Sequence, residues 1–243
     1  MSPPRVYHPQ NLQVGRDVTL SRAASHHLAR VLRVQVGDPV VLFDGGGGEH
    51  RGSVRSNERD AVRVRSESYD AVERESSLRV GLAQVISSGE RMDFTVQKAV
   101  ELGVAWIQPL TARRGKVRLK EERAERRTSH WQRVAIAACE QCGRNRVPSV
   151  HPIADLTQWL GAITGAGTRL VLQPGAQQRL AQITSAEGET TVLAGGESGF
   201  ADEDVEAALL RGFTPVRLGP RTLRTETAGL AALAAMQALW GDL

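Results

Sequence analysis

From residue 79 onward the sequence alternates short apolar runs with longer amphipathic segments, and this alternation restricts the possible folds most. Short runs rich in β-branched residues predict strands at 79–86, 104–110, 168–172, 190–193 and 213–218. Apolar residues at 3-4 spacing predict helices at 90–102, 121–142, 202–211 and 225–240. Strands separated by helices favour an α/β domain with a mainly parallel sheet.

The first seventy residues have a different pattern that is typical of a small β-barrel. Short strands are expected at 18–20, 39–43, 52–54 and 61–64, with one helix at 25–34 and a glycine turn at 45–48. A polar stretch without apolar periodicity then covers residues 70–77 and is interpreted as a linker. The predicted domains are therefore 1–73 and 74–243.

Composition narrows the class of protein. The chain has 243 residues, two cysteines and a net charge of +4. No apolar run approaches the roughly 20 residues of a membrane helix, and the N-terminus has no apolar leader segment. A cytoplasmic enzyme or RNA-handling protein without a membrane partner is expected.

Positive charge gathers in one stretch. Residues 111–146 carry eleven basic and four acidic side chains. Such a stretch is a candidate phosphate-binding surface. A solvated helix face explains it equally well, because Glu121, Glu122 and Glu125 stand among the arginines at helical spacings.

Familiar cofactor and metal motifs are missing from the sequence. No G-x-G-x-x-G follows a strand, and no G-x-x-x-x-G-K-[ST] occurs. Cys139 and Cys142 form a single C-x-x-C inside a predicted helix, which favours packing over metal or redox chemistry. No metal is expected.

Two loops near the C-terminus are the best candidates for a ligand site. AGGESGF at 194–200 and LGPRTLRTETA at 218–228 each follow a predicted strand, and the second opens the last helix. Small residues at a strand end allow close approach of a flat ligand, and a helix N-terminus can seat a charged group.

Four ordered blocks make the chain recognisable. RMDFTVQKAVELGV at 91–104, EQCGRNRVP at 140–148, and the two loops at 194–200 and 218–228 resemble blocks of the RsmE family. HLARVLR at 27–33 and Gly37-Asp38 resemble that family's PUA-like RNA-binding barrel. These proteins are 16S ribosomal RNA (uracil-N3)-methyltransferases of the SPOUT superfamily. The resemblance covers essentially the whole chain.

The resemblance implies several properties that composition and periodicity do not. It implies an N-terminal PUA-like β-barrel and a C-terminal SPOUT trefoil-knot domain that binds S-adenosylmethionine without a metal. It further implies a homodimer that completes the active site, and a substrate in 16S rRNA of the small ribosomal subunit, specifically uridine 1498.

Site residues follow from the matching blocks. Those expected at the cofactor are Leu172, Gly195, Gly196, Glu197, Leu218, Gly219, Leu223, Thr225 and Ala228. Arg224 is expected to stabilise the uracil anion and Glu226 to accept its proton, unless Arg224 pairs with Glu226 or Glu197 and only braces the loop. Residues expected at the RNA are Arg5, Arg30, Arg33, Arg91, Lys98, Arg144 and Arg146.

One loop departs from the family pattern. The family usually has Gly-Pro-Glu-Gly-Gly where this chain has Gly195-Gly196-Glu197-Ser198-Gly199. Loss of proline enlarges the freedom of the unfolded loop, and Ser198 adds a Cβ. The altered loop leaves open an RNA-binding protein without enzymatic activity as an alternative to uracil-N3 methylation. A second alternative is ribose 2′-O methylation within the same superfamily.

Overall fold

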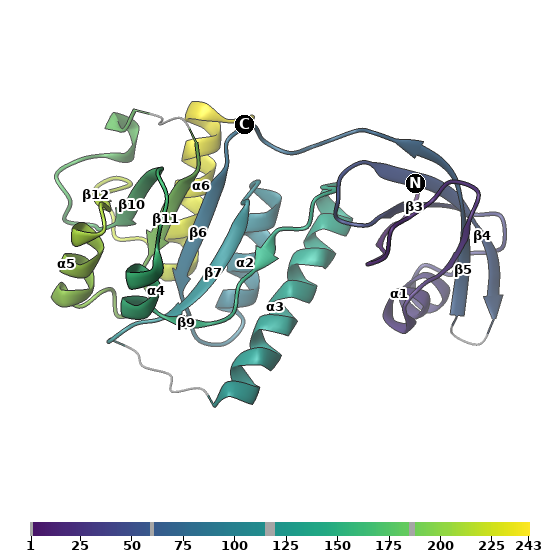
Figure 1. The fold of residues 1–243 in the computed structure, drawn as a ribbon, viewed down its shortest axis with the longest axis horizontal. Coiled ribbons are helices and arrows are strands. Elements are labelled where there is room, and N and C mark those ends of the chain that lie inside the picture. The colour runs from purple at the N-terminus through teal and green to yellow at the C-terminus, as the bar shows by residue number, and fades with distance from the viewer. Residues whose placement is uncertain (1, 59–60, 115–119, 185–187) are drawn as a thin grey trace. The chain divides into compact units, whose positions relative to one another are not determined.

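A computed structural model describes residues 2–58, 61–114, 120–184 and 188–243 (Figure 1). The chain forms two compact units, and each is described by itself. Unit 1 comprises residues 1–75 together with 139–147, and unit 2 comprises 76–138 together with 148–243. Within the described residues no helix is long and apolar enough to cross a bilayer.

Unit 1 is built on a five-stranded sheet with the order β1-β3-β4-β5-β2. Its strands are β1 (Arg5–Tyr7), β2 (Asp17–Thr19), β3 (Pro39–Phe43), β4 (Glu49–Glu58) and β5 (Ala61–Asp70). The antiparallel pair β4–β5 is much longer than the sequence predicted. Alternate valines along it, Val54, Val62 and Val64, are buried in the core of this unit, as the two-residue period of a strand requires.

The predicted helix at 25–34 is wrong in its bounds. Helix α1 (Arg22–His26) begins three residues earlier, because the Ser21 hydroxyl accepts a hydrogen bond from the backbone N–H of Ala24 at 3.2 Å. A π-helical turn, His27–Val31, follows it. The expected linker at 70–77 is also shorter at its start, since β5 runs to Asp70.

Unit 2 contains the parallel sheet that the alternating pattern predicts, in the order β12-β10-β11-β6-β7-β8, with β9 also paired to β7. Its strands are β6 (Val80–Val85), β7 (Trp106–Thr111), β8 (Ser149–Val150), β9 (Ala154–Asp155), β10 (Thr168–Leu172), β11 (Thr190–Ala194) and β12 (Thr214–Val216). Its helices are α2 (Arg91–Glu101), α3 (Glu121–Cys142), whose last turn belongs to unit 1, α4 (Leu156–Ala162), a 3-10 turn (Leu180–Gln182), α5 (Asp202–Leu210) and α6 (Thr225–Trp240).

Helices cover both faces of this sheet. Helices α2 and α6 contact each other, as do α4 and α5, and Figure 1 shows the two pairs on opposite sides of the strands. The short elements β8, β9 and α4 were not predicted. Helix α4 is too short for a clear periodicity, but Asp155 caps it by accepting from the N–H groups of Thr157 and Gln158.

Candidate functional site

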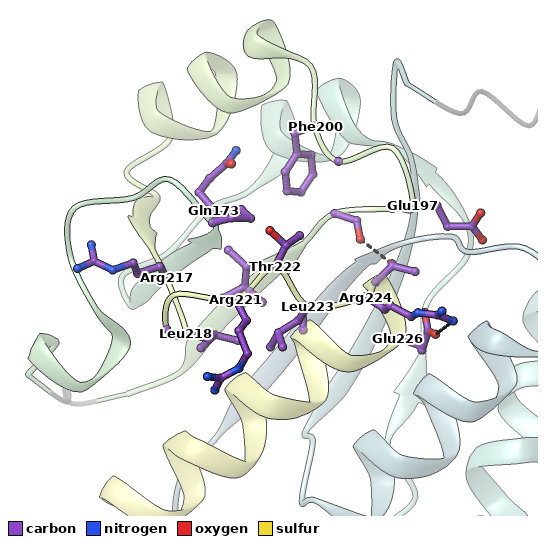
Figure 2. Close-up of a pocket in the computed structure, with 18 of the residues that line it drawn as sticks. Gln173, Glu197, Phe200, Arg217, Leu218, Arg221, Thr222, Leu223, Arg224 and Glu226 are labelled. Atoms are coloured by element: carbon purple, nitrogen blue, oxygen red, sulfur yellow. Dashed lines mark hydrogen bonds and ion pairs between the residues drawn. The ribbon is translucent and has the colours of Figure 1, made fainter.

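One cavity of unit 2 lies where three neighbouring strands end. Strands β10, β11 and β12 are parallel and adjacent, so the segments that follow them meet at one edge of the sheet. The cavity has a volume of about 440 Å³. Residues from these segments line it, together with the start of α6 and the first residue of α2 (Figure 2).

All nine residues expected at the cofactor line this single cavity, although they come from three separate stretches of the sequence. The structure adds residues that the sequence did not single out. They are the last residue of β12 and residues of the segments that follow β10, β11 and β12: Val216, Gln173, Pro174, Gly199, Phe200, Arg217, Arg221 and Thr222. Position beyond a predicted strand could have identified all of them except Val216 and Arg217, which lie inside the strand predicted at 213–218.

A buried hydrogen-bond cluster supports the loop after β11. The side-chain amide of Gln84 donates to the carbonyl oxygen of Gly195 at 3.2 Å and to the Thr225 hydroxyl at 3.1 Å. The Thr225 hydroxyl donates in turn to the same Gly195 oxygen at 2.7 Å. Thr225 therefore acts on the cavity through the backbone of Gly195 as well as by lining it.

Gly196 lies against the strand beneath it. A Cβ at this position would stand 3.0 Å from Cγ1 of Val85, closer than ordinary van der Waals contact. The absence of a side chain thus lets the loop lie directly on β6. Loop and strand stay in contact at the position where the family pattern has proline.

One end of the cavity is strongly charged. Glu197 pairs with Arg91 at 2.6 Å and accepts hydrogen bonds from the backbone N–H and hydroxyl of Ser88 at 3.0 and 2.6 Å. The hydrogen bonds from Ser88, followed by Arg91, lower the pKa of Glu197 below its ordinary value. Figure 2 shows the Glu197 side chain pointing away from Leu218 and Leu223.

The two residues expected to be catalytic also lie at this end. Oε1 of Glu226 is 4.0 Å from Nη1 of Arg224 and 4.0 Å from Nε of Arg91. The Glu226 side chain is 16% exposed, and its Oε2 is buried without a hydrogen-bond partner among the described residues. Of the two bracing partners considered for Arg224, Glu226 forms an ion pair with it, whereas Glu197 pairs with Arg91 instead.

Two of the residues expected at RNA are structural instead. Arg5 forms an ion pair with Glu49 and donates to Oδ1 of Asn145 at 2.6 Å. Arg144 pairs with Glu75 at 2.5 Å, and only 7% of its side chain is exposed. Because these guanidiniums are engaged and largely buried inside unit 1, phosphate contact by them is not supported.

The other expected RNA residues are more accessible. Arg30 and Arg33 are exposed beside the π-helical turn. Arg146 is exposed but lies 3.5 Å from Glu73, and Lys98 pairs with Glu101 at 2.8 Å. Arg91 lines the cavity.

The basic stretch around α3 is in part a solvated helix face. Residues 115–119 lie outside the described part of the chain. Within α3, Arg126 pairs with Glu122 at 2.6 Å, and both side chains are exposed. In the C-x-x-C of the last turn of α3, Cys139 is buried and Cys142 is partly exposed, and burial raises the pKa of the Cys139 thiol to about 12.

Comparison with known proteins points to RNA methylation. Residues 74–237 match the RNA methyltransferase domain family, and residues 20–65 match the RNA methyltransferase PUA domain family. The ribosomal RNA small subunit methyltransferase E of Buchnera aphidicola is 32% identical over 240 residues, covering 99% of this chain and 98% of that protein. The Bacillus subtilis protein of the same name is 27% identical over 235 residues, covering 93% and 92%.

Solved structures agree with these relatives. A putative methyltransferase from Legionella pneumophila, in complex with S-adenosylmethionine, superposes with a TM-score of 0.96 at 37% identity. A ribosomal RNA small subunit methyltransferase E from Neisseria gonorrhoeae, bound to S-adenosylmethionine, gives 0.93 at 42% identity. Each match covers 100% of both chains.

Proposed function

Because this chain belongs to the ribosomal RNA small subunit methyltransferase E family, we propose that it methylates N3 of a uracil in 16S rRNA with S-adenosylmethionine. It has the PUA-like N-terminal domain and the SPOUT-type α/β methyltransferase domain of that family. One observation carries the chemistry: the glycine-lined cavity ends at a partly buried carboxylate flanked by two guanidiniums.

The residues present fit the cofactor. The cavity volume of about 440 Å³ lies within the roughly 300–1,000 Å³ of small-molecule sites. Leu172, Leu218 and Leu223 offer apolar surface for an adenine ring, and the backbone at Gly195 and Gly196 offers close approach. The bound cofactor supplies an electrophilic methyl group on a positively charged sulfur.

The chain's own residues must then make the uracil nucleophilic. N3 carries a proton and attacks a methyl group only after that proton leaves. Glu226, which lines the cavity, accepts the proton on its carboxylate. The negative charge that remains on the uracil is stabilised by the neighbouring guanidinium of Arg224.

Binding of the RNA substrate is assigned to the exposed arginines. Arg30 and Arg33 in the domain at 1–73 would contact phosphates, with Arg146 extending that surface. Three further properties are proposed from the family resemblance: a trefoil knot in the domain at 74–243, a homodimer, and a cytoplasmic location.

Nucleoside mass spectrometry tests the proposal. The protein is incubated with S-adenosylmethionine and unmodified small-subunit rRNA, free or assembled into particles, and the RNA is digested to nucleosides. N3-methyluridine is the expected product. A 2′-O-methylated nucleoside would overturn the assignment, and failure to bind the cofactor in calorimetry would favour a non-enzymatic RNA-binding protein.

A further inference from the structure

Two guanidiniums form ion pairs with the carboxylate of Glu226 without a hydrogen bond. Its Oε1 lies 4.0 Å from Nε of Arg91 and 4.0 Å from Nη1 of Arg224. Both separations exceed hydrogen-bond distance. Nε of Arg91 and Nη1 of Arg224 therefore remain able to donate to a ligand that enters beside the carboxylate, and Figure 2 shows Arg224 and Glu226 next to each other.

Glu226 itself lacks a donor on its inner oxygen. Oε2 is buried and has no hydrogen-bond partner among the described residues. A buried acceptor without a donor costs about 1–3 kcal/mol, more when it is charged. Glu226 also lies in the first turn of α6 and lines the cavity. These observations favour a ligand that brings an N–H or O–H group.

Arg91 is held in this position by a second carboxylate. Oε1 of Glu197 receives donors from Nη1 of Arg91 and from both the backbone and the hydroxyl of Ser88. Arg91 is the first residue of α2, where the helix dipole disfavours a positive charge. Glu197 offsets that cost and keeps the guanidinium directed toward Glu226.

The site therefore combines one acceptor with two donors. The imide edge of uracil presents the complementary groups, an acceptor oxygen on each side of the N3–H donor. Cytosine places an amino donor beside an N3 that can only accept, so it would oppose an N–H group to a guanidinium and a lone pair to a carboxylate. The array also fits the reaction, since the charge left by the N3 proton spreads onto the two flanking oxygens.

We propose that Arg91, Glu226 and Arg224 read the imide edge of the target uracil, and that Glu197 and Ser88 are positioning residues that act through Arg91. The proposal rests on the methyltransferase function above and adds the groups that select the base. The sequence predicts that Arg91 contacts RNA and that Glu197 contacts the cofactor. The proposal assigns both residues to recognition of the uracil instead.

The test compares two RNAs made by transcription, one with uridine and one with 5-fluorouridine, whose N3 proton is more acidic. Arg91→Gln should lower kcat about 100-fold on uridine RNA, the usual effect of losing one donor to a developing anion. On 5-fluorouridine RNA the loss should be less than about 10-fold, because the anion needs less stabilisation. Glu197→Gln should lower kcat about 10-fold on uridine RNA, and by less on 5-fluorouridine RNA.

Controls separate this role from simple bracing. Cofactor affinity, measured by calorimetry, should stay within about twofold of wild type in both variants, because neither residue is assigned to the cofactor. Arg79→Gln removes a comparable exposed ion pair of unit 2, with Glu189 at 3.2 Å, and should leave both rates unchanged. Arg91→Lys keeps the charge and should retain part of the rate if Arg91→Gln does not fold.

Two results would overturn the proposal while wild-type activity is intact. One is an equal loss of rate by Arg91→Gln on both RNAs. The other is a tenfold or greater loss of cofactor affinity in Glu197→Gln, which would make Glu197 a cofactor ligand. Absence of N3-methyluridine with the wild-type protein would instead overturn the function on which the proposal rests.

Discussion

Replacement of Thr225 by valine tests whether the loop after β11 is shaped by the hydrogen bonds beneath it. Valine has nearly the same shape as threonine, so the exchange replaces only the hydroxyl by a methyl group. The hydroxyl donates to the Gly195 carbonyl oxygen at 2.7 Å and accepts from Nε2 of Gln84 at 3.1 Å. Both bonds are lost, and no large cavity is created at this buried position because valine fills nearly the same volume.

The expected cost follows from what remains bonded. Nε2 of Gln84 still donates to the carbonyl oxygens of Val85 and Gly195, at 3.0 and 3.2 Å, so neither partner of Thr225 is left without a hydrogen bond. Two net hydrogen bonds of about 0.5–1.5 kcal/mol each give a loss of about 1–3 kcal/mol in the free energy of unfolding. We also expect the altered loop to weaken cofactor binding by about 1 kcal/mol, which lowers the affinity about fivefold.

Tryptophan fluorescence during urea unfolding measures the stability term. The four tryptophans of the chain, Trp106, Trp131, Trp159 and Trp240, all lie within unit 2, so the signal reports on the unit that holds the cavity. Calorimetric titration with S-adenosylmethionine measures the affinity. Thr225→Ser is the matched control: it keeps the hydroxyl and should keep wild-type affinity.

Wild-type cofactor affinity in Thr225→Val together with weakened affinity in Thr225→Ser would refute the reasoning. That pattern would mean that the methyl group, and not the hydroxyl, shapes the loop. Equal stability of Thr225→Val and the wild-type protein would likewise show that these hydrogen bonds contribute nothing net.

Three further predictions concern other parts of the chain. Gly195→Leu should block cofactor binding in calorimetry while RNA affinity in filter binding changes little, since a Cβ there already lies 3.2 Å from the Phe200 ring; an equal loss of RNA affinity would contradict this division. RNA affinity should fall steeply as salt rises from 50 to 200 mM, and a flat response would exclude the arginine surface. Burial raises the pKa of Glu49, but the guanidiniums of Arg5 and Arg74 outweigh it and leave that pKa below its ordinary value of 4.5. Ionised Glu49 therefore stabilises unit 1 above its unfolded-state pKa, and this contribution is lost as pH falls through the lower folded-state pKa. Glu49→Gln should destabilise the protein by about 1.5–3 kcal/mol at pH 7 in calorimetry, with a smaller difference near pH 4; a pH-independent difference would count against the ion pairs.

Local sequence determined most elements of unit 2. Helices 121–142 and 225–240 and the strand at 168–172 have the bounds that their periodicity predicts. Apolar spacing over several turns is a property of the segment itself, so it can be read without knowing the partner. The short elements α4, β8 and β9 escaped prediction because two to seven residues do not establish a period.

The sequence also determined which segments form the cavity, because loops that follow adjacent parallel strands meet at one edge of the sheet. It did not determine what each charged side chain does there. Glu197 meets Ser88 across 109 residues, and Arg144 meets Glu75 across 69. Hydrogen-bond and ion-pair partners so far apart along the chain are chosen by the fold, so only the tertiary structure showed that Arg5 and Arg144 are buried in ion pairs of unit 1 and that Arg91 lies at the cavity.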